Sequence, residues 1–219
     1  MTTKHIHLRP YESGDFDALA VIMFDTWYST DIKPDTSADE LDRMEAMARL
    51  DVAHYLATST HAVLAVSDTD GQVLGAALWR NDSDWSKGMS LARYVQMELE
   101  SVRQRVRIDD KFAQFYEHFV ADSRRTGELA APVATMCGAE LRLFMMSPLS
   151  RGKGVGKKLL SCAEDSMRQS GAHQYYLYTD TECDYSFYDH RRLECAAQQH
   201  RVTGPSGALV DKFIYVGKL

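Results

Sequence analysis

The sequence lacks several features that would assign it to a common class. No apolar run approaches the roughly 18 residues that cross a membrane, and the first fifteen residues, MTTKHIHLRPYESGD, contain no apolar leader segment. The four cysteines form no CxxC pair and no Cys/His group with metal-ligand spacing. These absences predict a soluble, cytoplasmic protein with reduced thiols, no metal and no membrane partner.

An excess of positive charge is also missing. The chain has 25 Lys and Arg residues against 31 Asp and Glu residues, a formal net charge of -6. A general nucleic-acid binder normally carries a basic face, so we expect no nucleic-acid partner. A net negative field attracts cations, which favours a cationic or neutral substrate. The composition does not decide the oligomeric state, and a homodimer is one possible partner arrangement.

The chain alternates strand and helix patterns, which predicts a mixed α/β domain with one core. Asp70-Gly71 is a hairpin turn pair between two β-rich runs. The apolar run 131–148 predicts a buried strand that ends at Pro148, and Gly171 closes the helix that follows. In chain order we expect a strand, two helices, a hairpin, a helical segment, the buried strand, a helix, a strand, a short helix and two strands.

The helical segment between the hairpin and the buried strand, about residues 81–130, is called the insert below. Its apolar residues recur three or four apart in two groups that separate near Ile108–Asp110, which predicts two helices instead of a linker. Earlier in the chain, Ser37 with Glu40 three residues later predicts the start of a helix. We therefore expect residues 1–219 to form a single domain.

Residues 151–160, RGKGVGKKLL, place three glycines at alternate positions directly before an apolar helical pattern. This is no Walker loop, because Arg151 stands at the first glycine position and Lys158 where Ser or Thr is required. It is no dinucleotide fingerprint either, because Lys157 replaces the third glycine. Glycines let a backbone approach a ligand, and free amides of a first helical turn point at one spot. The segment therefore predicts an anion site, with a tight strand-to-helix turn as the alternative.

Together with the strand before it, LRLFMMSPLSRGKGVGKKLL resembles the acetyl-coenzyme A signature of the GNAT N-acetyltransferase superfamily, Q/R-x-x-G-x-G/A. Arg151, Gly154 and Gly156 match its defining positions. The resemblance covers the chain from about residue 4 to the end, except the insert, where the family usually has a short turn. It implies a mixed, mostly antiparallel central sheet of about seven strands flanked by helices, with the helical insert between strands 3 and 4. It also implies acetyl-coenzyme A as cosubstrate.

In this family the loop amides hold the coenzyme A pyrophosphate, and the preceding strand pairs through its backbone with the pantetheine arm. The resemblance implies that coenzyme A contacts consecutive loop residues, namely Arg151, Gly152, Lys153, Gly154, Val155, Gly156 and Lys157. By spacing along the strand, the backbone groups near Phe144 and Met146 are expected to pair with the pantetheine arm. Their side chains are expected in the core.

Two residues are candidate catalytic groups. Glu140 lies eleven residues before Arg151, where several family members carry a catalytic glutamate, and an acid in an otherwise apolar strand suits a general base. Pairing with Arg142 is the alternative for Glu140. Tyr188, within YSFYDHRRLE, falls at the tyrosine that donates to the departing thiolate in the family. Departures from the family pattern around it keep Tyr185 as the alternative acid.

The resemblance implies an N-acetyltransferase in which a primary amine attacks the thioester of acetyl-coenzyme A directly. We expect a small-molecule acceptor in a pocket between the first two helices, with Trp27 and Tyr28, and the insert. Four acids of the insert would suit a cationic acceptor: Asp82, Asp84, Glu98 and Glu100. A non-catalytic module that binds acyl-coenzyme A for regulation is the alternative function, and an acyl donor other than acetyl stays open.

Overall fold

The computed structural model describes residues 6–150, 152–204 and 208–219 of the chain. Its centre is a seven-stranded sheet in the order β1-β2-β3-β4-β5-β7-β6. The strands are β1 (Ile6–Pro10), β2 (His61–Ser67), β3 (Val73–Asn81), β4 (Ala139–Met146), β5 (Gln174–Asp180), β6 (Glu194–Thr203) and β7 (Leu209–Lys218). Neighbouring strands are antiparallel except β4 and β5, which are parallel. The mixed, mostly antiparallel sheet that the resemblance implied is confirmed.

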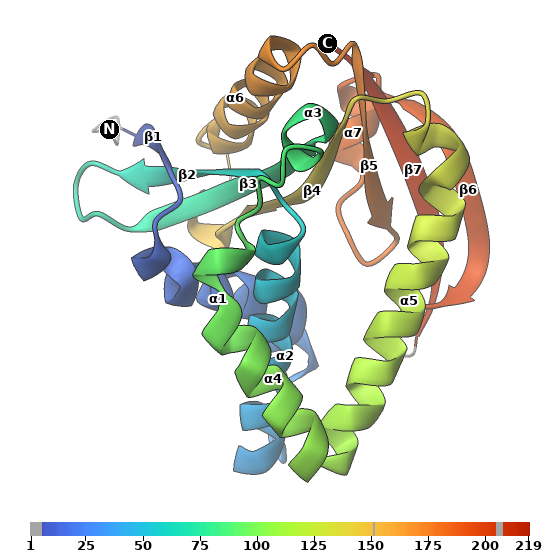
Figure 1. Ribbon diagram of the computed structural model, residues 1–219. Helices are drawn as coiled ribbons and strands as arrows, with labels where there is room; N and C mark the ends of the chain where they lie inside the picture. The colour runs from blue at the N-terminus through green and yellow to red at the C-terminus, as the bar shows by residue number, and fades with distance from the viewer. Residues whose placement is uncertain (1–5, 151, 205–207) are drawn as a thin grey trace.

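Helices cover both faces of this sheet (Figure 1). They are α1 (Phe16–Met23), α2 (Ala38–Ala57), α3 (Asp82–Trp85), α4 (Gln96–Ile108), α5 (Asp110–Ala134), α6 (Val155–Gln169) and α7 (Ser186–His190). In the N-terminal half of the sheet, α6 packs on one face and α1 with α2 packs on the other. Each face of the sheet therefore has its own hydrophobic core, and alternate residues of β3 pack into the two cores. Leu78 packs on the α1–α2 side and Trp79 packs on the α6 side.

In the C-terminal half, α5 covers the sheet on the same face as α1 and α2. Ala130 and Val133 of α5 pack against Tyr176 of β5 and Ile214 of β7. The opposite face of β7 carries Tyr215, which packs against α7. The face that carries α1, α2 and α5 is called the insert face below, and the face that carries α6 and α7 is called the loop face.

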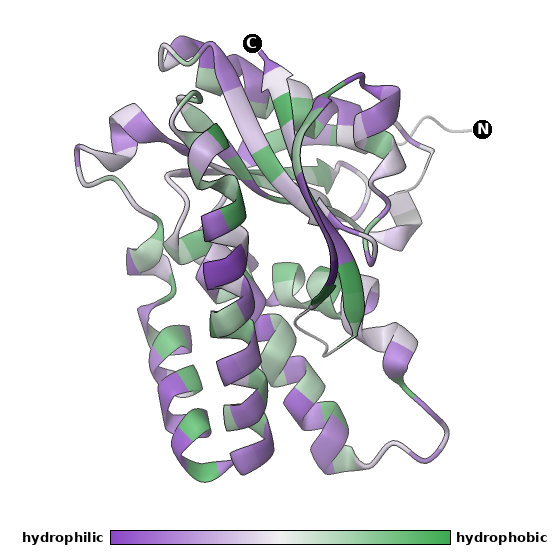
Figure 2. Cartoon of the chain, turned by 90° about the vertical axis from the view of Figure 1, so that its right-hand side faces the viewer, coloured by the Kyte–Doolittle hydropathy of each residue, from purple (hydrophilic) through white to green (hydrophobic). Residues whose placement is uncertain are grey.

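The insert is helical, as predicted. The chain breaks between α4 and α5 at Asp109, whose carboxylate accepts the backbone N–H groups of Lys111 and Phe112 and so caps α5. Helix α4 packs against α2, and α5 packs against the C-terminal strands, so the insert bridges the two halves (Figure 1). Hydrophobic and hydrophilic residues alternate along both helices, and the turn that joins them lies away from the sheet (Figure 2).

One boundary prediction is wrong. Residues 131–134 belong to the last turn of α5, not to the buried strand, which begins only at Ala139. Ala130 and Val133 lie three apart on one helical face and pack together on the sheet, which stabilises the helix through this apolar stretch despite Pro132. The insert therefore runs on beyond residue 130, as far as the start of β4.

The first helix continues into an irregular turn. Residues Phe24–Tyr28 form a π-helical turn directly after α1. Such wider turns are uncommon and are frequent at functional sites, because they redirect side chains from the regular helical face. Helix α2 begins as the sequence predicts, with the Ser37 hydroxyl accepting the Glu40 N–H at 3.2 Å.

Candidate functional site

The two central strands separate after a short paired stretch. Parallel pairing between β4 and β5 covers Ala139–Leu141 of β4, whereas β5 stays paired with β7 as far as Asp180. The β3–β4 register also shifts between Leu78 and Trp79, which makes Arg142 the extra residue of a β-bulge in β4. From this bulge onward β4 presents an open edge toward β5.

The backbone of Phe144 and Met146 faces this open edge. Ser147 donates its N–H to the Leu74 carbonyl of β3 at 2.9 Å. Successive residues of a strand direct their backbone groups to opposite sides, so the N–H and C=O groups of Phe144 and Met146 point away from β3. Both side chains lie on the loop face, where the Phe144 ring packs 5.4 Å from the ring of Phe187.

The chain passes from β4 into α6 through the predicted glycine loop. Gly152 and Gly154 have φ angles of 73° and 71°, the left-handed region that favours glycine. Gly154 is the N-cap of α6, and Lys158 donates its N–H to the Gly154 carbonyl at 3.3 Å. The backbone N–H groups of Val155–Lys157 belong to the first helical turn, where intrahelical acceptors are missing. Arg151 lies outside the described residues.

The remaining loop residues hold the turn in shape. Lys153 donates its N–H to the Ser150 carbonyl at 3.2 Å, and the side chains of Lys153 and Lys157 are exposed. Gly156 lies against β4, because an added Cβ would stand 2.7 Å from Met146 Sδ and 3.3 Å from Phe144 Cζ. The missing side chain lets the positive end of α6 approach the open edge closely.

Tyr188 lies on α7, on the loop face beside the open edge. Its side chain is 9% exposed, and its ring packs 5.6 Å from Phe187 and 5.7 Å from Tyr215. Because Phe187 contacts Phe144 of β4, α7 lies directly against the strand that precedes the glycine loop. Burial raises the pKa of the Tyr188 phenol above its ordinary value, so the hydroxyl keeps its proton at neutral pH. Tyr185 packs instead against Phe213, 5.1 Å between ring centres.

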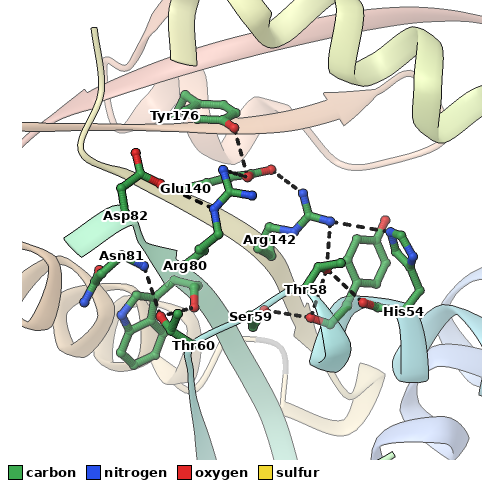
Figure 3. Close-up of polar contacts among 12 residues, drawn as sticks. His54, Thr58, Ser59, Thr60, Arg80, Asn81, Asp82, Glu140, Arg142 and Tyr176 are labelled. Carbon is green, nitrogen blue, oxygen red and sulfur yellow. Dashed lines mark hydrogen bonds and ion pairs between the residues drawn. The ribbon is translucent and has the colours of Figure 1, made fainter. Parts of the chain in front are cut away.

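Glu140 is buried at the closed end of the strand separation, 7% exposed, and its carboxylate has three partners (Figure 3). Arg142 Nη1 donates to Oε1 at 2.6 Å, while Arg80 Nη2 lies 3.2 Å from Oε2. The Tyr176 hydroxyl donates to Oε2 at 2.9 Å. The alternative that the sequence left open, pairing with Arg142, is therefore observed. Both oxygens of this carboxylate are therefore already occupied by strong donors.

Arg142 connects the bulge in β4 to the end of α2 (Figure 3). Its Nη2 donates to Thr58 Oγ1 at 2.8 Å and lies 3.5 Å from His54 Nε2. Burial and the Arg142 charge lower the pKa of His54 to about 4, so the imidazole is neutral at neutral pH. The guanidinium carbon also lies 5.9 Å from the centre of the Tyr55 ring.

A second carboxylate lies on α2, one helical turn before Tyr55. The Tyr28 hydroxyl, at the end of the π-helical turn, donates to Asp51 Oδ2 of α2 at 2.6 Å. Burial raises the pKa of Asp51 to about 7, although the Tyr28 hydrogen bond opposes the shift. Tyr55 follows one helical turn later on the same face of α2. Our sequence reasoning placed Tyr28 here but missed Asp51, because its spacing does not distinguish it from the other acids of α2.

Trp27 lies against the loop that follows β5. Burial raises the pKa of the Cys183 thiol to about 11, while hydrogen bonds from Trp27 and Thr179 oppose the shift. The Cys183 charge in turn raises the pKa of Tyr55 and of Tyr188. The two aromatic residues expected in an acceptor pocket, Trp27 and Tyr28, both lie in the π-helical turn, and Tyr28 contacts Asp51.

The insert closes a cavity of about 230 Å³ against α2. Its lining is mainly apolar and comes from three helices: Leu50 and His54 of α2, Leu99, Val102 and Arg103 of α4, and Tyr116, Phe119, Val120 and Ser123 of α5. The His54 ring packs edge-on against Phe119, 5.0 Å between ring centres. His54 thus separates this cavity from the Arg142 contacts at the strand separation.

The four acids of the insert that we expected to suit a cationic acceptor already have basic partners. The pairs are Asp82 with Arg80 at 3.4 Å, Asp84 with His61 at 2.8 Å, Glu98 with Arg49 at 2.8 Å and Glu100 with Arg103 at 3.2 Å. That expectation loses its physical basis. Within residues 6–150, 152–204 and 208–219, no group of three or more His, Cys, Asp or Glu side chains could hold a metal ion. No described helix is long and apolar enough to cross a membrane.

The separated strands, the glycine loop and the α6 N-terminus define the class of this protein. Residues 24–191 match the model of the acetyltransferase (GNAT) family, which spans more than half of the chain. The chain belongs to this family, as the sequence resemblance implied, and is an acetyltransferase. The comparison with curated proteins found no match.

Solved structures of N-acetyltransferases share the fold over nearly the whole chain. The N-acetyltransferase from Staphylococcus aureus Mu50 is 15% identical, with 98% of each chain covered and a TM-score of 0.52. Drosophila melanogaster polyamine N-acetyltransferase, which catalyses the formation of N-acetylagmatine, is 14% identical, with 98% of this chain and 100% of that chain covered and a TM-score of 0.53. Salmonella typhimurium yncA, solved with its cofactor acetyl-CoA, is 21% identical, with 98% and 94% covered and a TM-score of 0.50. At these identities the likeness concerns the fold.

Proposed function

We propose that this protein transfers the acetyl group of acetyl-coenzyme A to the primary amine of a small molecule. The observation that carries the proposal is the open edge of β4, which leads directly into the left-handed glycine loop and the N-terminus of α6. In this reading the pantetheine amides pair with the backbone of Phe144 and Met146. The pyrophosphate accepts hydrogen bonds from the amides of residues 152–157, where the helix dipole favours an anion.

The amine approaches from the insert face. The α6 N-terminus lies on the loop face, whereas α2 and the insert border the strand separation from the opposite side. The amine nitrogen attacks the thioester carbonyl carbon, the new C–N bond forms, and the C–S bond breaks with its electron pair going to sulfur. The Drosophila neighbour, which forms N-acetylagmatine, supports a small amine as acceptor. The cytoplasmic location and the homodimer stay predictions.

The test measures thiol release from acetyl-coenzyme A with a panel of primary amines, together with the melting temperature of the protein. Acetyl-coenzyme A at a hundred times its Kd should stabilise the fold by about 2.7 kcal/mol. Thiol release should require both substrates. No melting shift at millimolar acetyl-coenzyme A contradicts the proposal, whereas binding without thiol release for any amine supports the non-catalytic module.

Tyr188→Phe should lower kcat and leave the Kd for acetyl-coenzyme A unchanged. The substitution removes only the hydroxyl that we propose as proton donor to the departing thiolate, and it keeps the ring that packs on Tyr215. A positioned acid is typically worth about 10²–10⁴-fold, and a thiolate needs less help than an alkoxide, so the low end is expected. Steady-state kinetics and ligand titration measure the two quantities separately.

Tyr185→Phe is the matched control, because it removes a phenol from the other tyrosine at the start of the same helix. It should leave kcat near the unsubstituted value. A large loss in Tyr185→Phe with no loss in Tyr188→Phe would move the acid role to Tyr185. An unchanged kcat in both variants would assign the proton to water.

A further inference from the structure

We infer that Asp51, oriented by Tyr28, binds the ammonium group of the acceptor amine and takes its proton. This inference rests on the proposed N-acetyltransferase function, and it moves the general base from Glu140 on β4 to a carboxylate on α2. It makes Asp51 a catalytic residue and Tyr28 a positioning residue. The acceptor is then an amine that enters as a cation from the insert face.

The position of Asp51 follows from its neighbours. Tyr55, four residues later on the same face of α2, contacts the guanidinium of Arg142 at the β4 bulge. The pKa of Tyr28 is raised by burial, by Asp51 and Tyr55, and also by Glu182 from the loop that follows β5. The Asp51–Tyr28 pair therefore joins α2 to the π-helical turn, one turn of α2 away from the residue that contacts Arg142 at the β4 bulge.

The partners of Asp51 differ in kind from those of Glu140. Glu140 has two guanidinium groups and a phenol, which compensate its charge and occupy both oxygens. Among the described residues, the hydrogen bond to Asp51 comes from the neutral Tyr28 hydroxyl, and no ion pair to a basic side chain forms. Asp51 is partly buried, and removing a carboxylate from water without a cation costs free energy unless a cationic ligand completes it; an ammonium substrate supplies that charge.

The proton affinity of the Asp51 carboxylate suits a general base. Burial raises the pKa of Asp51 to about 7, near the pH at which a base must alternate between its two forms. The charged and titratable groups that act on the Asp51–Tyr28–Tyr55 cluster are Arg142 of β4, Asp180 of β5, and Glu182 and Cys183 of the following loop, with His54 beside Tyr55 on α2. Arg142 is the cation among them that acts on Tyr55, and it is held by Glu140.

Base and acid then stand on opposite walls of the strand separation. Asp51 lies on α2 of the insert face, and Tyr188 lies on α7 of the loop face. The open edge of β4, with the backbone of Phe144 exposed, passes between the two walls. A thioester bound along that edge would lie between the helix that carries Asp51 and the helix that carries Tyr188.

The proton balance is complete with these groups. Asp51 accepts one proton from the ammonium, which frees the nitrogen lone pair for attack on the carbonyl carbon. As the C–S bond breaks, Tyr188 donates its proton to the departing sulfur to give the free thiol, and the second proton of the nitrogen restores the Tyr188 hydroxyl. Asp51 returns its proton to solvent after the product leaves. One ammonium and one thioester thus yield one amide, one thiol and one solvent proton.

The experiment compares Asp51→Asn and Glu140→Gln in the thiol-release assay, with an amine that the unsubstituted protein acetylates. Asp51→Asn should lower kcat/KM for the amine by about 10²–10⁴-fold and leave the Kd of acetyl-coenzyme A unchanged. The unsubstituted protein should lose activity below a pH of about 7 as Asp51 becomes protonated. This fall in activity at low pH, called the acid limb of the pH profile below, should be absent in Asp51→Asn and present in Glu140→Gln.

Glu45→Gln is the matched control, because Glu45 is an exposed acid on the same helix and its substitution removes the same charge. It should keep the kinetics and the pH profile of the unsubstituted protein. Tyr28→Phe removes the hydrogen bond that lowers the pKa of Asp51, so the acid limb should shift to higher pH. A merely structural role for Tyr28 would change stability without moving this limb.

Two outcomes overturn the inference while the proposed function stands. One is an Asp51→Asn variant as active as the unsubstituted protein. The other is an acid limb that persists in Asp51→Asn and disappears in Glu140→Gln, which returns the base to Glu140. An unsubstituted protein that binds acetyl-coenzyme A but releases no thiol with any amine contradicts the proposed function itself, so the two failures are distinguishable.

Discussion

A valine in place of Gly154 should abolish the binding of acetyl-coenzyme A and leave a folded protein. Gly154 has a φ of 71° and caps α6. The left-handed conformation costs an L-residue with a side chain roughly 1–2 kcal/mol, and more where the side chain is β-branched. The loop should relax toward negative φ, and its amides would no longer converge on one phosphate position. The melting temperature of Gly154→Val should therefore be the same with and without acetyl-coenzyme A.

Gly71→Val separates the loss of a glycine from the loss of the ligand site. Gly71 also has a φ of 71°, it is exposed in the β2–β3 hairpin, and an added Cβ would meet nothing within 4 Å at either glycine. Both variants should lose similar stability without ligand. Only Gly71→Val should regain the full melting shift with acetyl-coenzyme A. A full shift in Gly154→Val would exclude the loop from the phosphate site.

Features that depend on neighbouring residues could be predicted from the sequence. The hairpin turn at Asp70-Gly71, the Ser37 cap and the break at Asp109 each depend on side chains and backbone within a few residues. The glycine loop belongs to the same group, because left-handed φ angles and a helix start are local properties. The order of strands followed because the family resemblance supplied the topology.

Features that depend on tertiary packing could not be predicted. An apolar stretch such as residues 131–134 fits a strand or a helix equally well, and the packing of Val133 on Ile214 decides for the helix. The partners of Glu140 come from β3 and β5, and only the strand register brings Arg80 and Tyr176 to it. No local pattern shows that this acid is paired.

The same limit applies to Asp51. Helix α2 carries several acids, of which Asp51 is partly buried and the others, Asp39, Glu40, Asp42 and Glu45, are exposed. What distinguishes Asp51 is the π-helical turn that brings the Tyr28 hydroxyl to it and the contact of Tyr55, one helical turn later, with Arg142 at the β4 bulge. Both are consequences of the assembled fold, so the residue to which we assign the proton transfer is one that sequence spacing alone does not identify.

Removing the Asp122 carboxylate should lower the free energy of unfolding more than any substitution of an exposed residue of the insert. Lys212 of β7 is 0% exposed and donates its ammonium to the Asp122 carboxylate of α5 and to Thr126 Oγ1, the latter at 2.8 Å. Asp122→Leu leaves this ammonium buried beside the Thr126 hydroxyl and the Tyr178 ring, and it also removes the 3.5 Å ion pair between Asp122 and Arg125. Breaking a buried ion pair typically costs about 3–5 kcal/mol, so the free energy of unfolding in urea at pH 7 should fall by that amount.

The double variant Asp122→Leu/Lys212→Met identifies the cause, because it removes both charges and fills the site with apolar groups. Replacement of a whole buried pair is often neutral, so most of the lost unfolding free energy should return. Hydrogen exchange of backbone amides should show where the structure is weakened. Helix α5 contacts the C-terminal strands through this ion pair, so the amides of residues 110–134 should exchange faster in Asp122→Leu but not in the double variant. If the double variant is no more stable than Asp122→Leu, the loss of unfolding free energy comes from altered packing. The unpaired ammonium of Lys212 is then not the cause.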